Sequence, residues 1–176
     1  MVTVIAKKYV RALLEGKSLE NVEGYYKDLH ILNDVYNLDK MKNIILSPDI
    51  AKSDKFDFII SLLDNCDNRI RNFINILVQN DRIYLLPAIC DEIRYQISVR
   101  KNEFIGNIIT KEAIDINSKR NIEEKISKKF NSSISLNNIV SNYPGIKIEI
   151  EDLGVEISFS INRLKAQMAE HILKAI

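Results

Sequence analysis

The sequence has no tryptophan and, among its 176 residues, only two cysteines, two histidines, three prolines and five glycines. The glycines are scattered, so the sequence has no glycine-rich loop of the kind that binds phosphates. Neither histidine has a carboxylate, cysteine or histidine partner at a metal-ligand spacing, which argues against a metal site. Neither cysteine belongs to a Cys-x-x-Cys pair, and isolated cysteines of this kind are usually small buried apolar residues.

The sequence also lacks an excess of either charge, with 25 basic and 24 acidic residues and a formal net charge of +1. A nucleic-acid-binding protein needs a basic face to meet phosphates, so this balance argues against one. No apolar run is long enough to cross a bilayer, and the first residues lack the apolar core and cleavage site of a signal peptide. We therefore expect a cytosolic chain without direct membrane insertion, which leaves attachment to a membrane complex open.

Catalytic motifs are missing as well, because the sequence contains neither Gly-x-Ser-x-Gly nor a reactive-cysteine motif. Its acidic residues stand between apolar positions at helical spacing, which is typical of solvated helix faces rather than of paired catalytic carboxylates. The residues in question are Asp64, Asp67, Asp91, Glu92, Glu123 and Glu124. We predict no active site, no metal and no cofactor, and we do not expect an enzyme.

Apolar residues at helical spacing dominate the sequence from residue 3 to residue 96. In the stretch that begins at Arg69 they recur at i, i+3, i+4 and i+7, which predicts one buried stripe, formed by Ile70, Phe73, Ile74 and Leu77. Asn80-Asp81 favours a turn after this helix, and Pro87 lies early in the next one, where proline is tolerated. Ser53 is the expected N-cap of an earlier helix that carries Phe56, Ile59, Ile60 and Leu63. With the other helices counted in the same way, the first part of the chain is an antiparallel bundle of about six helices.

Two of these helices are apolar over a wider arc than one core contact requires. The helix of residues 3–15 has Ile5, Tyr9 and Leu13 beside a second apolar side, and Ile76 lies off the stripe of the Phe73 helix. Such a helix is either buried all round or exposes a surface to a partner, and the pattern alone leaves both interpretations open.

The pattern changes after Asn102. Residues 104–110 are typical of a strand, and Ser118 is the expected cap of a helix that carries Ile122, Ile126 and Phe130. Alternation of apolar and polar residues predicts further strands near residues 134–140, 146–151 and 155–160. A final helix is expected from Asn162, with Leu164, Met168 and Ile172 on one face. The predicted fold class is therefore α+β, with an all-α bundle in residues 1–104 and a small α+β unit in residues 105–176.

Several motifs, taken together and in order, resemble a known family. This sequence has Asn80-Asp81-Arg82-Ile83 followed by Leu86-Pro87 and Ile89, which is similar to the segment Asn-Gly-Arg-Leu…Leu-Pro-x-Ile of the delta subunit of F-type ATP synthases. The mitochondrial counterpart of that subunit is the oligomycin-sensitivity-conferring protein. Further matches to that family are Ala6, Tyr9 and Ala12-Leu13, then Pro144-Gly145-Ile146-Lys147-Ile148, and finally Arg163-Leu164. The resemblance spans essentially the whole chain, and its main departures are Asp81 in place of a glycine, Tyr143-Pro144, and Ile157-Ser158-Phe159-Ser160.

The resemblance implies a non-catalytic stator subunit of a proton-translocating ATP synthase, attached peripherally at the cytoplasmic face of the bacterial inner membrane. Such a subunit links the catalytic head to the peripheral stalk, so that proton flow drives ATP synthesis. The family binds the N-terminal helix of an alpha subunit between its first and fifth helices, and its second unit contacts b-type stalk subunits.

These expectations select candidate residues for each contact. For the alpha subunit we predict Ile5, Tyr9, Leu13, Phe73, Ile76 and Asn80, of which Tyr9 and Ile76 follow from the match and the others from helical spacing. For the stalk we predict Leu164, Met168 and Ile172, although the same stripe is compatible with a core position.

Two alternative functions belong to other classes. A helical RNA-binding regulator would require a basic stripe that the near-neutral charge does not supply, and salt-sensitive RNA binding would support it. A small enzyme would require a pocket built from residues that the periodicity assigns to the surface, and turnover by the purified chain would support it.

Overall fold

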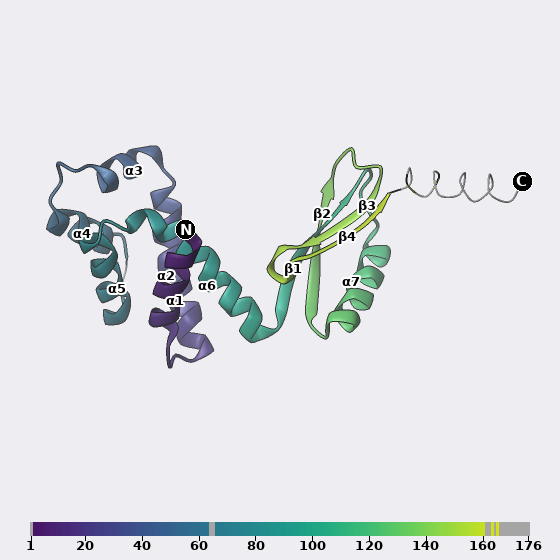
Figure 1. Ribbon diagram of the computed structural model, residues 1–176, viewed down its shortest axis with the longest axis horizontal. Coiled ribbons are helices and arrows are strands. Elements are labelled where there is room, and N and C mark those ends of the chain that lie inside the picture. The colour runs from purple at the N-terminus through teal and green to yellow at the C-terminus, as the bar shows by residue number, and fades with distance from the viewer. Residues whose placement is uncertain (1, 64–65, 161–162, 164, 166–176) are drawn as a thin grey trace, which may run out of the picture. The chain divides into compact units, whose positions relative to one another are not determined.

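A computed structural model describes residues 2–63, 66–160, 163 and 165 (Figure 1). The chain divides into two compact units, Met1–Ile97 and Ser98–Ile176, and each has its own cluster of buried apolar side chains. The division falls within a helix and a few residues before the predicted boundary at residue 104.

The first unit is all-α, as predicted. Its helices are α1 (Val2–Leu14), α2 (Leu19–Tyr36), α3 (Asp39–Leu46), α4 (Lys52–Ser61), α5 (Asn68–Gln79) and α6 (Leu86–Lys101), and a 3₁₀ turn at Ile83–Leu85 precedes α6. The stripe predicted on α5 is buried, with Ile70, Ile74 and Leu77 each fully inaccessible to solvent. Burial of these side chains against α2 and α6 residues such as Leu29 and Ile89 forms the centre of the bundle.

The turn between α5 and α6 has the geometry that the Asn80-Asp81 pair predicts. Asp81 adopts a left-handed conformation with φ 54°, which aspartate tolerates better than most residues. The Arg82 amide donates to the Leu77 carbonyl at 2.8 Å and the Asp81 amide to the Val78 carbonyl at 3.0 Å. These two bonds form a Schellman motif, which satisfies carbonyl groups at the end of α5.

Two predicted helix caps are wrong. Ala51, not Ser53, is the N-cap of α4, and the Ser53 hydroxyl donates to the Asp54 side chain instead. In the second unit Asp115, not Ser118, caps α7 (Ile116–Phe130), because its carboxylate accepts the amides of both Asn117 and Ser118. A hydrogen bond from the Ser118 side chain, together with those from the two backbone amides, favours the charged form and holds the pKa of Asp115 below its usual range.

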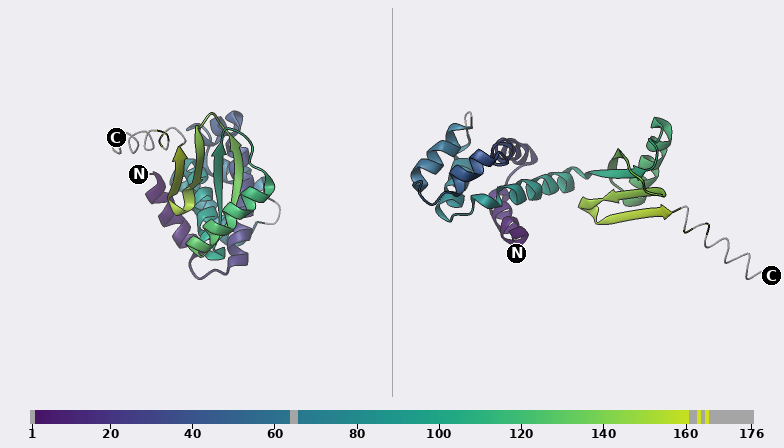
Figure 2. Two further views of the ribbon diagram at one scale, coloured as in Figure 1. Left: turned by 90° about the vertical axis from the view of Figure 1, so that its right-hand side faces the viewer. Right: turned by 90° about the horizontal axis from the view of Figure 1, so that it is seen from above.

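The second unit contains a four-stranded sheet in the order β2-β1-β3-β4. The strands are β1 (Glu103–Thr110), β2 (Ser133–Val140), β3 (Gly145–Ile150) and β4 (Val155–Ser160). β1 and β2 are parallel and are joined through α7, whereas β3 pairs antiparallel with both β1 and β4. This arrangement confirms the α+β fold class, and Figure 2 shows it from two further sides.

One face of the sheet packs against α7. Phe104, Ile108, Ile134 and Leu136 are buried on that face together with Ile126 of α7. The predicted C-terminal helix from Asn162, with Leu164, Met168 and Ile172, lies outside the described residues apart from Arg163 and Lys165.

Gly106 lies on the packed face, where a side chain has no space. A Cβ added there would lie 2.8 Å from both the Glu149 carbonyl oxygen and Ile150 Cγ1, so we expect Gly106→Ala to destabilise the protein by about 1–3 kcal/mol. The control is Gly24→Ala in α2, where no atom lies within 4 Å, and it should stabilise by about 0.5–1 kcal/mol. Denaturant unfolding followed by circular dichroism measures both, and a Gly106→Ala protein as stable as wild type would contradict the packing described here.

The two cysteines differ in accessibility. Cys90 is buried and its thiol donates to the Leu29 carbonyl at 3.4 Å, whereas Cys66 is only partly buried. Burial raises the pKa of Cys90 to about 12, and burial also raises the pKa of Cys66, with a further contribution from the Asp28 carboxylate.

We therefore expect Cys66 to react slowly, and Cys90 to react hardly at all, with a thiol reagent in the folded protein. With iodoacetamide near pH 8 we expect modification of Cys66 alone, because Cys90 is neither accessible nor ionised at that pH. Intact-mass spectrometry should show a single adduct in the native protein and two in guanidinium. Rapid double labelling of the native protein would show that the core around Cys90 opens readily.

Candidate partner-binding surface

Helices α1 and α5, the first and fifth of the chain, are neighbours in the bundle. The rings of Tyr9 and Phe73 lie edge to face with centroids 6.1 Å apart. Arg69, at the start of α5, donates from Nη2 to the Ala12 carbonyl at 2.9 Å, near the end of α1. The beginning of α5 therefore lies beside the end of α1, and the two helices run antiparallel.

The six residues predicted for the alpha-subunit contact divide into two groups. Leu13 and Phe73 belong to the core, with 3% and 6% of their surface exposed. Ile76 is 49% exposed, Asn80 is exposed, and Ile5 and Tyr9 are half-buried. The structure thus brings Ile5, Tyr9, Ile76 and Asn80 to the surface of adjacent helices, and we refer to these four as the α1–α5 face.

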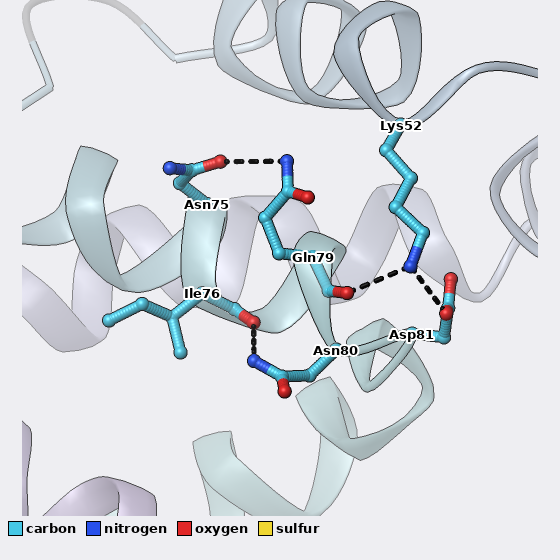
Figure 3. A network of polar contacts seen from close by, with 6 residues as sticks. All are labelled: Lys52, Asn75, Ile76, Gln79, Asn80 and Asp81. Atoms are coloured by element: carbon cyan, nitrogen blue, oxygen red, sulfur yellow. Dashed lines mark hydrogen bonds and ion pairs between the residues drawn. The ribbon is translucent and has the colours of Figure 1, made fainter.

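Ile76 owes its exposure to its position on α5. Its neighbours Ile74 and Leu77 are fully buried, so the side chain of Ile76 points away from the core that they form. Asn80 is fixed close by, because its Nδ2 donates to the Ile76 carbonyl at 2.7 Å (Figure 3). This hydrogen bond holds the Asn80 side chain against the last turn of α5, next to the Ile76 backbone.

Arg82 is a residue of this surface that the sequence reasoning missed. Its Nη1 donates to the Tyr9 hydroxyl at 2.7 Å, and its guanidinium carbon lies 5.7 Å from the centre of the Tyr9 ring. In the sequence, Arg82 is marked only as part of the Asn80-Asp81-Arg82 segment that resembles the family motif. That motif does not indicate which side chain Arg82 contacts.

A separate cavity borders the α5–α6 turn, whose Asp81 and Ile83 are among its lining residues. It has a volume of about 580 Å³, and its lining residues are Ile45, Pro48, Ile50, Ala51, Lys52, Lys55, Ile59, Val78, Asp81 and Ile83. At its rim, Lys52 Nζ donates to the Gln79 carbonyl at 2.8 Å and pairs with the Asp81 carboxylate at 2.6 Å (Figure 3). The six predicted residues are not part of this lining, so the cavity and the α1–α5 face are distinct.

The described part of the chain contains neither a cluster that could bind a metal nor a helix that could span a membrane. Within it no three His, Cys, Asp or Glu side chains gather in a way that could hold a metal ion. None of the helices in that part combines the length and apolar character needed to span a membrane.

Comparisons with known proteins agree with the motifs. The family model described as ATP synthase delta (OSCP) subunit matches residues 5–168. ATP synthase subunit delta of Campylobacter fetus subsp. fetus is 47% identical over 176 residues and the match covers all of both chains. The proteins of the same name from Campylobacter concisus and Aliarcobacter butzleri are 42% and 39% identical, with 98% and 100% of each chain covered.

A solved structure shares the fold. A chain in the cryo-EM structure of the Toxoplasma gondii mitochondrial ATP synthase hexamer matches with a TM-score of 0.67, and the match covers 98% of this chain and 97% of that one. Only 15% of the aligned residues are identical, so this likeness concerns the fold. On the family match and the full-length relatives, the chain belongs to the ATP synthase delta (OSCP) subunit family.

Proposed function

We propose that this chain is a non-catalytic stator subunit, which links the catalytic head of an F-type ATP synthase to its peripheral stalk. In this proposal the α1–α5 face binds the N-terminal helix of an alpha subunit. The observation that carries the proposal is the 49% exposure of Ile76 on α5, the helix whose Phe73 packs against the half-buried Tyr9 of α1. An exposed isoleucine and a half-buried tyrosine on adjacent helices both lose contact with water when one partner helix covers them.

The composition of the face fits a helical partner. Ile5 and Tyr9 are four residues apart on α1, as are Ile76 and Asn80 on α5, so each helix contributes two positions of one face. Full burial of an isoleucine side chain contributes about 1.5–3 kcal/mol of free energy. Ile76 is half exposed, so a partner that covers it would supply part of that free energy to binding. Tyr9 adds aromatic area that is already held in place by Phe73 and Arg82.

The second unit is proposed to contact the b-type stalk subunits. The candidate residues Leu164, Met168 and Ile172 follow from the sequence pattern alone. The described residues add apolar surface on the paired strands β3 and β4, where Ile146 is opposite Phe159 and Ile157 lies two residues before Phe159. Phe159 is 51% exposed and Ile146 and Ile157 are 37% exposed, so this strip is also available to a partner.

Two contacts on one complex strengthen each other. Once one unit is bound, the other is held at a high effective concentration near its own partner, so neither contact needs extreme affinity. The subunit would then act peripherally at the cytoplasmic face of a bacterial inner membrane, without a cofactor, while proton flow drives ATP synthesis in the assembled enzyme.

The binding proposal predicts the behaviour of one variant. A synthetic peptide of about 20 residues, or ~30 Å of helix, from the alpha subunit's N-terminus should bind the full chain with one-to-one stoichiometry. Ile76→Asp should weaken this binding by at least about tenfold, because the complex would bury an unpaired carboxylate. Isothermal titration calorimetry measures both affinities.

The matched control is Ile116→Asp, which places the same charge at a residue that is 75% exposed on α7 of the other unit. It should leave the affinity unchanged. Absence of peptide binding to a folded wild-type chain, or equal loss in the two variants, would remove the α1–α5 face from the proposal.

A further inference from the structure

The two helices of the α1–α5 face differ in charge from the rest of the chain. Neither α1 nor α5 contains an acidic residue, whereas together they contain the basic residues Lys7, Lys8, Arg11, Arg69 and Arg71. Over the whole sequence the basic and acidic residues nearly cancel, at 25 and 24. The acidic residues that compensate these charges therefore lie elsewhere in the chain.

Some of these basic side chains are directed away from the face. Lys7 pairs with Glu92 of α6 at 3.8 Å, and the Arg71 guanidinium lies 5.8 Å from the centre of the Phe56 ring of α4. Lys8 is exposed next to Tyr9, and it has no ion-pair partner among the residues that the structure describes. Arg69 precedes Phe73 by four residues, and its contact with the Ala12 carbonyl holds it beside α1.

Arg82 completes the basic border of the face. One of its N–H groups is used by the Tyr9 hydroxyl, and the described residues provide no hydrogen-bond acceptor for the others. The neighbouring Asp81 is paired with Lys52 at 2.6 Å. The nearest acidic residue along α1 is Glu15, which follows the end of that helix.

We propose that the α1–α5 face selects a helix whose apolar stripe is bordered by carboxylates, and that Arg82 is the residue that binds one of them. This inference rests on the proposed function, since it specifies the chemistry of the helix that the same face binds. Arg82 then has two roles, because it positions the Tyr9 ring and presents its remaining N–H groups to the partner.

The physical basis is charge-assisted hydrogen bonding at a partly buried site. A guanidinium presents a rigid fork that matches a carboxylate, and such bonds are stronger than those between neutral groups. Because Tyr9 already fixes one side of the fork, less side-chain entropy is lost when the partner binds. The exposed charge of Lys8 and the half-buried charge of Arg69 add a longer-range attraction that salt screens.

Two synthetic helical peptides with the same leucine stripe test the inference. One has glutamate at the positions that border the stripe, and the other has glutamine there. We expect the glutamate peptide to bind the full chain about tenfold more tightly at low salt, and this preference should shrink between about 0.05 M and about 0.5 M NaCl.

Variants of the chain assign the preference to Arg82. Arg82→Gln should reduce the glutamate preference about fivefold, and Arg82→Lys should retain part of it because the charge remains. Tyr9→Phe removes the hydrogen bond that fixes Arg82 but leaves the charge, so the glutamate preference should fall, but by less than in Arg82→Gln. Arg120→Gln, at an exposed arginine of α7, is the matched control and should change neither affinity.

The outcomes distinguish the carboxylate preference from the proposal that the α1–α5 face binds a helix. If both peptides bind equally at all salt concentrations and Ile76→Asp abolishes binding, the carboxylate preference is wrong and the face remains a helix-binding site. If neither peptide binds a folded chain, both are wrong. An unchanged glutamate preference in Arg82→Gln would assign the selectivity to residues other than Arg82.

Discussion

The contact between α1 and α5 is the constraint on which the account of this subunit depends. Phe73 packs its ring against the edge of Tyr9, and Arg82 donates to the hydroxyl of the same tyrosine. At the other end, Arg69 ties the start of α5 to carbonyl groups near the end of α1. Because buried residues such as Leu13 and Leu77 pack both helices into the core, Tyr9 and Ile76 are held on the surface of adjacent helices, so the proposed contact would need little ordering.

The α5–α6 turn links this surface to the rest of the bundle. Asp81 occupies the left-handed position that ends α5, where many residues would be strained, and Lys52 of α4 pairs with its carboxylate. The same turn places Arg82 where it reaches Tyr9. One short segment therefore ends a helix, anchors it to α4 and completes the α1–α5 face, which gives a physical reason for the compact run of turn and charged residues there.

Most of the helices, strands and core residues could be predicted from the sequence, because the burial of a side chain follows the periodicity of apolar residues. The stripe of Ile70, Ile74 and Leu77 depends on local spacing and is confirmed. The alternation in β3 is confirmed for Ile148 and Ile150, whereas Ile146 is 37% exposed. The cap of α7 was mispredicted because Asp115 and Ser118 are both suitable polar residues and the geometry selects Asp115, whereas α4 begins at Ala51 without any side-chain cap. The parallel pairing of β1 with β2 and the contact of Arg82 with Tyr9 join residues far apart in the chain, which spacing does not reveal.

Photo-crosslinking in the assembled enzyme tests the central claim most directly. A benzophenone amino acid at position 76 would lie on the exposed part of the α1–α5 face, and the matched probe at position 116 would lie on the other unit. The account predicts that the probe at 76, and not the one at 116, crosslinks to the N-terminal segment of an alpha subunit, identified by peptide mass spectrometry. A crosslink from 76 to a stalk chain, or none in an intact complex, would contradict it.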